Sequence, residues 1–290
     1  MCHSFRAGDT SLNWTKLILG TAAAGAGLLL YGAWTSDRLV LEKKTLRLPL
    51  WPEKLDGYRI GLLADFHLRF DGESLRMAQE AVAMIVAEDP DMLILCGDTI
   101  AYWQPGIVEL IEQAFSGLGP LRGKTLAILG NHDYFCGPPD PFTPIFDELG
   151  IQLLRNQAIV RDGISWIGVE SAMAGDPQPY VAIGKADASL PMIVLWHEPD
   201  AVDMLPRGLD LMLSGHSHGG QFCAPWGWAP MTSKMGSKYR RGFYSETPVP
   251  LYVNRGISTT GPPSRLNCPA EATILTLRPG DLRCVGSSSK

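Results

Sequence analysis

The chain lacks a surplus of positive charge. Its 290 residues include 25 Lys and Arg against 30 Asp and Glu, which gives a formal net charge of −5 at pH 7. A general nucleic-acid-binding protein would instead show clustered basic residues. We therefore expect no nucleic-acid binding, and no feature of the sequence predicts a protein partner.

Paired cysteines and repeats are also missing. None of the six cysteines lies in a CxxC pair or in zinc-knuckle spacing, so we expect no disulfide framework. Cys96 ends an apolar run and should pack in the core, as free cysteine usually does. No internal repeat is present, and only residues 286–290 have low complexity. With 46% hydrophobic and 19% charged residues, the chain can fold as one large domain or two small ones.

An uncharged stretch rich in Leu, Ala and Gly runs from Leu17 to Trp34. At about 1.5 Å per residue, a helix of this length would reach roughly 27 Å, close to the hydrocarbon thickness of a bilayer. Trp14 and Tyr31 lie near its ends, where amphipathic rings favour the membrane interface. A cleaved signal peptide or a buried helix would share this composition, but the residues after Tyr31 make a poor cleavage site. We predict an N-terminal tail over 1–16, an uncleaved membrane anchor over 17–34, and a linker with a first strand over 35–57.

Beyond residue 57 the hydrophobic pattern alternates between strand and helix. Short apolar runs alternate with segments whose apolar residues recur at helical spacing. This β-α-β-α-β order predicts an α/β fold with a mainly parallel, buried sheet. The expected strands are 59–64, 92–96, 125–129, 164–169, 192–196, 209–214, 250–254 and 271–277, and the expected helices are 74–88 and 107–118. We expect the domain to cover residues 58–280 and a flexible tail to cover residues 281–290.

A polar cluster follows each of five apolar strands. In open α/β sheets, ligands gather at the carboxyl ends of the strands, so the five clusters should converge on one rim. All six histidines except His3 lie in these clusters. The clusters are Asp65-Phe66-His67, Gly97-Asp98-Thr99, Gly130-Asn131-His132-Asp133, His197-Glu198 and Gly215 to Gly220.

Each cluster taken alone has an ordinary explanation. A single Asp-x-His rarely binds metal, and Gly-Asp or Gly-Asn-His is a common turn. His216 and His218 are a stronger signal, because alternate residues of a strand face the same way. Five clusters in order, each at a strand end, favour a shared metal site.

This ordered run resembles the calcineurin-like metallophosphoesterase family, whose motifs are Asp-x-His, Gly-Asp, Gly-Asn-His, His and Gly-His-x-His. The match extends over about residues 59–277. Within the family the chain looks closest to a membrane-anchored bacterial branch, which includes enzymes similar to UDP-2,3-diacylglucosamine diphosphatases and other phosphodiesterases. The motifs that carry this likeness are His197 to Asp200, Gly215 to Gln221 and Leu251 to Gly256. The resemblance implies a four-layer αββα sandwich with two divalent metals between the sheets.

The resemblance also implies a complete set of ligands for both metals. The expected ligands are Asp65, His67 and His218 for the first metal, Asn131, His197 and His216 for the second, and Asp98 as the bridge. Carboxylate and imidazole together suit Mn²⁺, Fe or Zn²⁺ better than Mg²⁺, and Mn²⁺ is our first choice.

A dinuclear centre of this composition would be cationic. Two divalent ions outweigh the two carboxylates, and the amide and imidazole ligands are neutral. Such a centre attracts an anion and stabilises the charge that develops on phosphoryl oxygens. Two metals about 3.5–4 Å apart can activate water for in-line attack on phosphorus. His132, directly after Asn131, would protonate the leaving group or stabilise the phosphoryl oxygens, with a structural role as the alternative.

Residues 222–244 form a long, loop-like stretch with many aromatic and basic residues. The stretch is either a flap packed on the domain or a lip that faces substrate and membrane. In the second case its rings would seat acyl chains and its cations would meet phosphates. The candidate substrate-binding residues are Trp226, Trp228, Arg240, Arg241 and, in a later loop, Arg265 with Asn267.

The sequence therefore predicts a membrane-anchored phosphodiesterase or pyrophosphatase that acts on a phosphorylated lipid or a sugar-nucleotide lipid. The alternatives are a cell-envelope phosphodiesterase on polymer or small soluble diesters, and a non-enzymatic metal-binding protein. The resemblance implies a single-pass protein of a bacterial cytoplasmic membrane. Basic residues flank the predicted anchor on both sides, and the positive-inside rule slightly favours a cytoplasmic catalytic domain.

Overall fold

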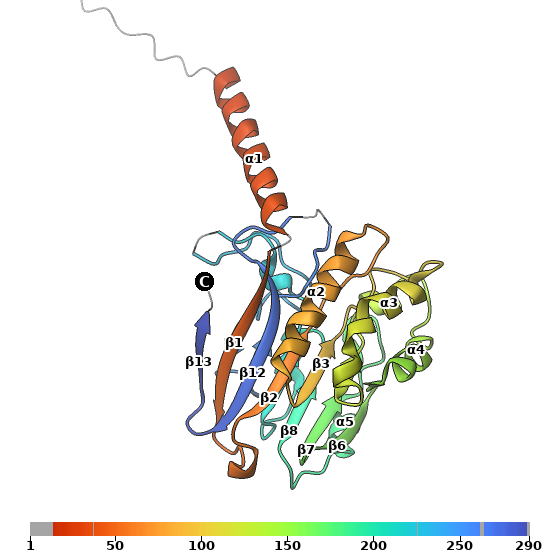
Figure 1. Ribbon diagram of the computed structural model, residues 1–290. Coiled ribbons are helices and arrows are strands. Elements are labelled where there is room, and N and C mark those ends of the chain that lie inside the picture. The colour runs from red at the N-terminus through yellow and green to blue at the C-terminus, as the bar shows by residue number, and fades with distance from the viewer. Residues whose placement is uncertain (1–13, 37, 225, 262–263, 289–290) are drawn as a thin grey trace, which may run out of the picture.

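The computed structural model describes residues 14–36, 38–224, 226–261 and 264–288 (Figure 1). Most of the predicted tail, residues 1–13, lies outside the described residues. The first described element is helix α1 (Trp14–Ser36), which projects away from a body of two β-sheets and their covering helices.

The first sheet has seven strands in the order β13-β1-β12-β2-β3-β4-β5. Strands β2 to β5 are parallel, as predicted, while β12 runs antiparallel to β2 and parallel to β1. Every residue of β3 is buried, as expected for a central parallel strand covered on both faces. The strands are β1 (Leu39–Leu48), β2 (Tyr58–Leu63), β3 (Met92–Cys96), β4 (Thr125–Ile128), β5 (Ile151–Leu153), β12 (Ala270–Pro279) and β13 (Arg283–Ser288).

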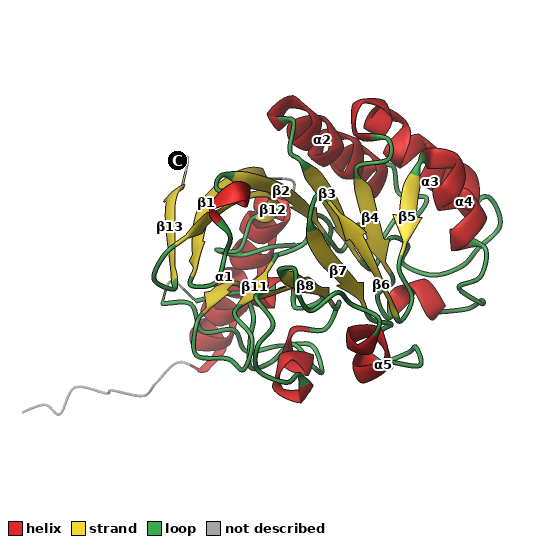
Figure 2. Cartoon of the chain, turned by 90° about the horizontal axis from the view of Figure 1, so that it is seen from below, coloured by secondary structure: helices red, strands yellow, loops and turns green. Residues whose placement is uncertain are grey.

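Three helices cover the outer face of this sheet: α2 (Glu73–Glu88), α3 (Ile107–Phe115) and α4 (Phe142–Leu149) (Figure 2). The buried residues of α2 include Met77, Ala78, Ala81, Val82 and Ile85, a spacing that places them on one face of the helix. The helix ends before Pro90, as the sequence predicts, because proline disfavours helical backbone in the residue before it.

The second sheet has six strands in the order β10-β11-β9-β8-β7-β6. Its outer face is covered by the short helix α5 (Pro179–Gly184) and a 3-10 segment, η4 (Pro199–Met204). The strands are β6 (Gln157–Arg161), β7 (Ile164–Gly168), β8 (Met192–Leu195), β9 (Leu211–Ser214), β10 (Gly242–Tyr244) and β11 (Leu251–Val253).

Buried clusters define the layers. One cluster lies between the first sheet and α2, α3 and α4, and another lies on the outer face of the second sheet. A third fills the space between the two sheets and contains Leu62 and Ile94 from the first sheet with Trp166 and Leu213 from the second. The predicted α/β sandwich is therefore confirmed. Its second helical layer, formed by α5 and η4, is smaller than the first, formed by α2, α3 and α4.

The expected flexible tail over 281–290 is wrong for the residues that the structure describes. Strand β13 pairs antiparallel with β1, from Arg47 opposite Arg283 to Glu42 opposite Ser288. Strand β1 itself lies between β13 and β12, so the domain begins near Leu39 and not at residue 58. The pairing partners are more than 200 residues apart, a relation that local sequence patterns do not reveal.

Helix α1 is exposed over most of its described length. Its Trp14–Gly32 span is long and apolar enough to cross a membrane by length and composition, a test that a signal sequence also passes. Gly32 is buried, because the last turns of α1 contact the loop between β11 and β12. The main-chain amide of Arg265 donates a hydrogen bond to the Gly32 carbonyl at 3.0 Å.

Candidate metal centre

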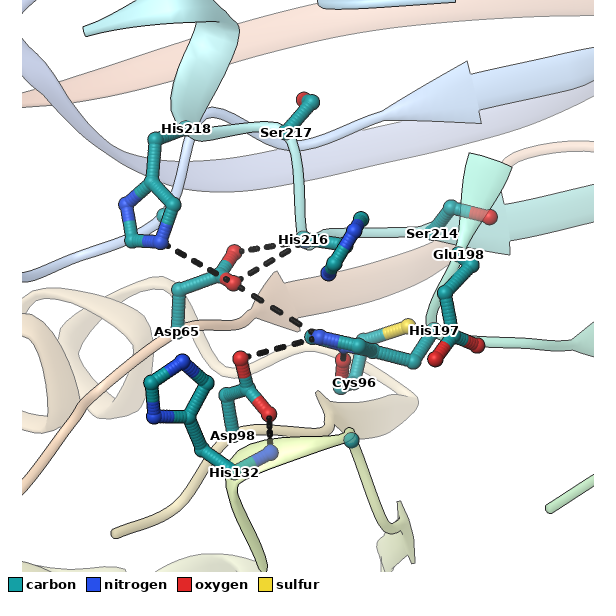
Figure 3. Close-up of polar contacts among 12 residues, drawn as sticks. Asp65, Cys96, Asp98, His132, His197, Glu198, Ser214, His216, Ser217 and His218 are labelled. Carbon is teal, nitrogen blue, oxygen red and sulfur yellow. Dashed lines mark hydrogen bonds and ion pairs between the residues drawn. The ribbon is translucent and has the colours of Figure 1, made fainter. Parts of the chain in front are cut away.

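The predicted polar clusters do converge on one rim, at the carboxyl ends of β2, β3, β4, β8 and β9 (Figure 3). Asp65 and His67 follow β2, and Asp98 follows β3. These side chains meet those of the segments after β8 and β9, so the space between them is enclosed by both sheets. All are nearly or fully buried.

One group of donor atoms consists of Asp65, His67 and His218. The Nε2 atoms of the two imidazoles are 3.0 Å apart. Asp65 Oδ1 is 4.0 Å from His67 Nε2 and 3.6 Å from His218 Nε2. Two ligand atoms bound at right angles, each about 2.1 Å from one ion, would be about 3.0 Å apart, so these separations fit a shared ion.

A second group consists of Asp98, His197 and His216. Asp98 Oδ2 is 3.1 Å from His197 Nε2 and 3.6 Å from His67 Nε2, which puts this carboxylate between the two groups. The amide oxygen of Asn131 is buried without a hydrogen-bond partner among the described atoms. A bound cation would satisfy this oxygen, and leaving it unsatisfied would be unfavourable.

The remote nitrogens of three imidazoles face main-chain carbonyl oxygens. His197 Nδ1 lies 2.7 Å from the Cys96 oxygen, and His216 Nε2 lies 2.7 Å from the Lys234 oxygen. His218 Nδ1 lies 3.2 Å from the oxygen of Ser258. A carbonyl can only accept, so each of these nitrogens carries the hydrogen, and the opposite nitrogen is turned toward the centre. This arrangement is typical of histidines that bind metals.

The backbone at these strand ends is unusual. Asp65, His67, Asp98, His216 and His218 all have positive φ, between 43° and 68°. This conformation is unfavourable for residues other than glycine, and it concentrates at functional sites. The turns send the ligand side chains back across the ends of the strands.

Two glycines are required by close approach to the ligands. A Cβ at Gly130 would lie 2.2 Å from Asp98 Oδ1, and a Cβ at Gly256 would lie 2.6 Å from the Cβ of Asp65. Any side chain at either position would displace a carboxylate. The glycines therefore permit the carboxylates to sit as deeply as they do.

Burial and the pairing of Asp98 with His197 set the pKa values of the centre. Removal from water raises the pKa of Asp65 to about 7 and lowers the pKa of His67 to about 3. The same effect holds the pKa of His218 well below its ordinary value. Burial would also raise the pKa of Asp98, but the neighbouring His197 outweighs it and holds that pKa well below the usual range.

These residues fit divalent metals. The imidazoles of His67 and His218 stay neutral near pH 7, so their lone pairs are available, and the buried carboxylates need a positive charge nearby. Nitrogen and oxygen donors together suit a transition metal. The structure thus brings all seven predicted ligand residues to one rim, with Asp98 between the two groups.

His132 lies at the edge of the centre and is partly exposed. Its main-chain amide donates to Asp98 Oδ1 at 2.8 Å, and its Nδ1 lies 2.8 Å from the carbonyl oxygen of Ala101. Its ring packs edge-on against His67 and is tilted against Phe135, both at 4.5 Å between centroids. With Nδ1 at the Ala101 carbonyl, the ring also forms a third group of donor atoms together with His67 and Asp98.

Two cavities flank the centre, on either side of Thr260 and Gly261, which line both. The first, of about 300 Å³, includes His218, Phe222 and Met231 in its wall. The second, of about 490 Å³, is lined by His67, Arg69, Tyr102, His132 and Phe135 among others. A substrate with two arms could place one arm in each cavity.

The 222–244 stretch is a flap that is fixed at its base and exposed at its tip. Ser217 Oγ donates to the Arg240 carbonyl, and Asp200 accepts hydrogen bonds from the amides of Ser237, Lys238 and Tyr239. At the tip, Trp226 is 79% exposed and Trp228 is 56% exposed. The interpretation as a packed flap holds for the base, and the interpretation as a lip that faces substrate and membrane stays a prediction for the exposed tip.

The candidate substrate-binding residues lie in different surroundings. Trp226, Trp228, Arg240 and Arg241 do not line either of the two cavities, although Met231 of the same flap does. Asn267 donates to the carbonyl of Cys223 at 2.8 Å.

Arg265 is fully buried, and its guanidinium bonds main-chain carbonyls. The prediction that Arg265 binds substrate is therefore wrong, because the side chain points into the protein behind His218.

Sequence reasoning assigned no role to three buried polar residues that hold the ligand turns. Asp133 accepts hydrogen bonds from the amides of Gly130 and Ile100. Glu198, next to His197, accepts from the Ala172 amide at 2.9 Å and from the Ser171 hydroxyl. Asn254 donates to Thr273 Oγ1 at 2.9 Å and accepts from the Gly256 amide at 2.7 Å. Each of the three residues lies close in the sequence to a predicted ligand or to a glycine of the centre. This proximity is the signal from which a supporting role could have been predicted.

Comparison with known proteins gives a consistent result. A profile of the calcineurin-like phosphoesterase family matches residues 58–220. The chain is 28% identical over 279 residues to the metallophosphoesterase YkuE of Bacillus subtilis, covering 91% of this chain and 96% of that protein. It is 31% identical over 242 residues to the phosphodiesterase YaeI of Escherichia coli, covering 80% of this chain and 86% of that protein.

Two further similarities are more distant. A transmembrane protein with a metallophosphoesterase domain from Danio rerio is 27% identical over 252 residues, covering 78% of this chain and 54% of that protein. Among solved structures, the nuclease MPE of Pseudomonas putida aligns with 70% of this chain and 77% of its own, at 19% identity and a TM-score of 0.39.

Proposed function

This chain belongs to the calcineurin-like phosphoesterase family, and from that membership we propose that it is a two-metal enzyme that hydrolyses a phosphodiester or pyrophosphate bond. The observation that carries the proposal is the pair of donor groups that share a rim, Asp65 with His67 and His218, and Asp98 with His197 and His216. Asn131 completes the second group.

Different residues of the centre contribute to different parts of the hydrolysis. When bound, two divalent ions, with Mn²⁺ as our first choice, supply Lewis-acid polarisation of a phosphate and activation of water at neutral pH. Asp98 lies between the groups and fixes their separation. His132 holds a proton at Nε2, toward the second cavity, and delivers it to the leaving oxygen.

Hydrolysis is tested with metal-stripped protein that is reconstituted with Mn²⁺, Fe²⁺ or Zn²⁺ and assayed on an activated phosphodiester. Asp98→Asn should lose most turnover and bind the metals weakly, because the carboxylate between the groups is gone. The matched control is Asp147→Asn, which makes the same change on the exposed face of α4. Metal uptake without hydrolysis of any diester would instead support the non-enzymatic alternative.

The substrate class that we propose is a lipid-linked phosphodiester or pyrophosphate, such as a sugar-nucleotide lipid, met at a membrane in which α1 is the anchor. The loop between β11 and β12 supports this, because it carries Thr260 and Gly261 of both cavity walls and also contacts α1 at Gly32. Figure 1 shows α1 leaving the body on the side where this loop and the flap lie. The cavities would then face the membrane surface.

The exposed flap tip supports the same substrate class. Trp226, Trp228 and Met231 are exposed at 79%, 56% and 64%, and Met231 also lines the first cavity. Tryptophan is favoured at the level of lipid headgroups, where one part of the ring is apolar and another is wet. An acyl chain that leaves the first cavity would meet these side chains.

Replacing both tryptophans with alanine tests the substrate class. Trp226→Ala with Trp228→Ala should reduce hydrolysis of a lipid-linked diester in vesicles about ten-fold or more and leave a small soluble diester almost unaffected. Full burial of one large apolar side chain contributes roughly 1.5–3 kcal/mol, and about 1.4 kcal/mol, reached by partial burial of the two rings, is already ten-fold. Tyr180→Ala is the control, since Tyr180 is 66% exposed on α5, away from α1. Equal losses on both substrates would favour a cell-envelope enzyme that acts on soluble or polymeric diesters.

A further inference from the structure

We propose that Arg265 is a positioning residue that couples the last turns of α1 to the metal ligand His218. The inference rests on the proposed metal-binding role of His218 and goes beyond it. It makes the helix a structural part of the catalytic centre and not only an anchor.

The guanidinium of Arg265 is enclosed by main-chain carbonyls. Nη1 donates to the carbonyl of Arg255 at 3.0 Å and to that of Cys268 at 3.3 Å. Nη2 donates to the carbonyl of Gly256 at 3.2 Å and to that of Ser258. The side chain is fully buried, so these carbonyls take the place of water around a permanent charge.

Two of these carbonyls adjoin the metal centre. The Ser258 oxygen also lies 3.2 Å from His218 Nδ1, and Arg265 Nη2 itself lies 3.4 Å from that nitrogen. Gly256 packs against Asp65, the ligand that shares a group with His218. The planar fork of Arg265 therefore fixes the atom that orients the His218 ring and the backbone behind Asp65.

The main chain of the same residue holds α1. The Arg265 amide donates to the Gly32 carbonyl at 3.0 Å. A Cβ at Gly32 would lie 2.1 Å from Ser264 Oγ, whereas a Cβ at Gly27 on the same helix would meet nothing within 4 Å. The helix end is thus fitted against Ser264 and Arg265, and a displacement there is transmitted directly to the buried guanidinium.

The first test is Arg265→Lys, which keeps the positive charge and removes the planar guanidinium that donates to several carbonyls at once. Groups that orient a metal ligand typically contribute 10–100-fold to metal affinity, so we expect one Co²⁺ site to weaken about ten-fold or more with an altered visible absorption spectrum. The melting temperature of the metal-free protein serves as the control for folding. Unchanged Co²⁺ affinity and spectrum would overturn the proposal.

The second test uses the helix and leaves Arg265 intact. Gly32→Ala should weaken the same Co²⁺ site several-fold, whereas Gly27→Ala, the same substitution in an open position, should not. Adding Ser264→Ala to Gly32→Ala removes the colliding oxygen and should restore the affinity. If Gly32→Ala and Gly27→Ala bound Co²⁺ equally well, or if Ser264→Ala did not restore the affinity of Gly32→Ala, the coupling would be overturned.

The outcomes separate the two proposals. If the unaltered protein binds no divalent metal, both the proposed function and the coupling fail. If the unaltered protein binds metals and hydrolyses diesters but Gly32→Ala has no effect on Co²⁺ binding, only the coupling fails. Should Arg265→Lys not fold, the comparison of Gly32→Ala with Gly27→Ala decides.

Discussion

Removing the imidazole of His132 should leave the metals in place and reduce turnover in a way that depends on the leaving group. In His132→Ala the main-chain amide remains, so its 2.8 Å hydrogen bond to Asp98 is kept. The lost ring is partly exposed, packs against His67 and Phe135, and places Nδ1 2.8 Å from the carbonyl oxygen of Ala101. Metal affinity should therefore change little.

The magnitude follows from the role of the proton. General acid catalysis contributes about 10²–10⁴-fold, or roughly 2.7–5.4 kcal/mol of transition-state stabilisation. The full loss should appear with an alkyl leaving group, which needs a proton, and a much smaller loss with p-nitrophenolate, which does not.

The assay measures kcat on a series of diesters with leaving groups of rising basicity. His132→Asn is the matched variant, because its amide can still donate to the carbonyl of Ala101 but cannot carry the proton. It should show the same dependence as His132→Ala. An equal loss of kcat for every leaving group, or a loss of metal binding in His132→Ala, would refute the role of His132 as the proton donor.

Three further outcomes follow from the structure. Gly130→Ala should abolish metal binding, because its Cβ would lie 2.2 Å from Asp98 Oδ1, while Gly119→Ala, with nothing within 4 Å, should bind normally in the same titration. Glu271→Gln should lower the free energy of unfolding in urea by about 1.5–3 kcal/mol, the usual contribution of a hydrogen bond to a charged group, because it removes one of the two carboxylates that pair with the partly buried Arg255 while Glu42 remains; a change below about 0.5 kcal/mol would contradict this. Chelation of the metals should lower the melting temperature and added Mn²⁺ should restore it, since a ligand at about 100 times its Kd stabilises the native state by about 2.7 kcal/mol. A melting temperature that does not change with chelator or Mn²⁺ would show that the native state binds no metal.

The central strands and the convergence of the polar clusters could be predicted from the sequence. Strand β3 was predicted with its observed bounds because five consecutive buried residues form a local apolar signal. Asp98 and Asn131 lie within three residues of the ends of such strands, so the edge of the sheet at which they lie could be predicted once the strands were known. The rule that parallel strands end on one edge then brings them together.

The strand at the C-terminus could not be predicted in this way. Residues 283–288 contain Gly286 and two serines, which have low intrinsic strand propensity. They form β13 because the exposed edge of β1 offers unpaired main-chain groups, and the ladder satisfies them. The stabilising partner lies at the other end of the chain.

Arg265 was misassigned for a related reason. Arginine is rarely fully buried, so a late arginine near aromatic and basic loops is typical of a surface that meets phosphate. Only the tertiary structure shows four carbonyl oxygens turned toward one guanidinium. The same charge that suggested substrate binding instead holds the backbone behind two ligands.

The loop between β11 and β12 explains why these features belong to one mechanism. Along this loop, Gly256 backs a carboxylate ligand, Ser258 orients an imidazole, Thr260 separates the two cavities, and Arg265 joins them all to α1. These contacts place the backbone behind two ligands, the wall shared by the two cavities and the contact with α1 on one segment of the chain. If α1 stabilises that loop, then removing the helix to obtain a soluble domain would change metal affinity as well as location. Activity measured on such a shortened domain would then understate that of the whole chain, and restoring residues 14–36 without any lipid present should recover the difference.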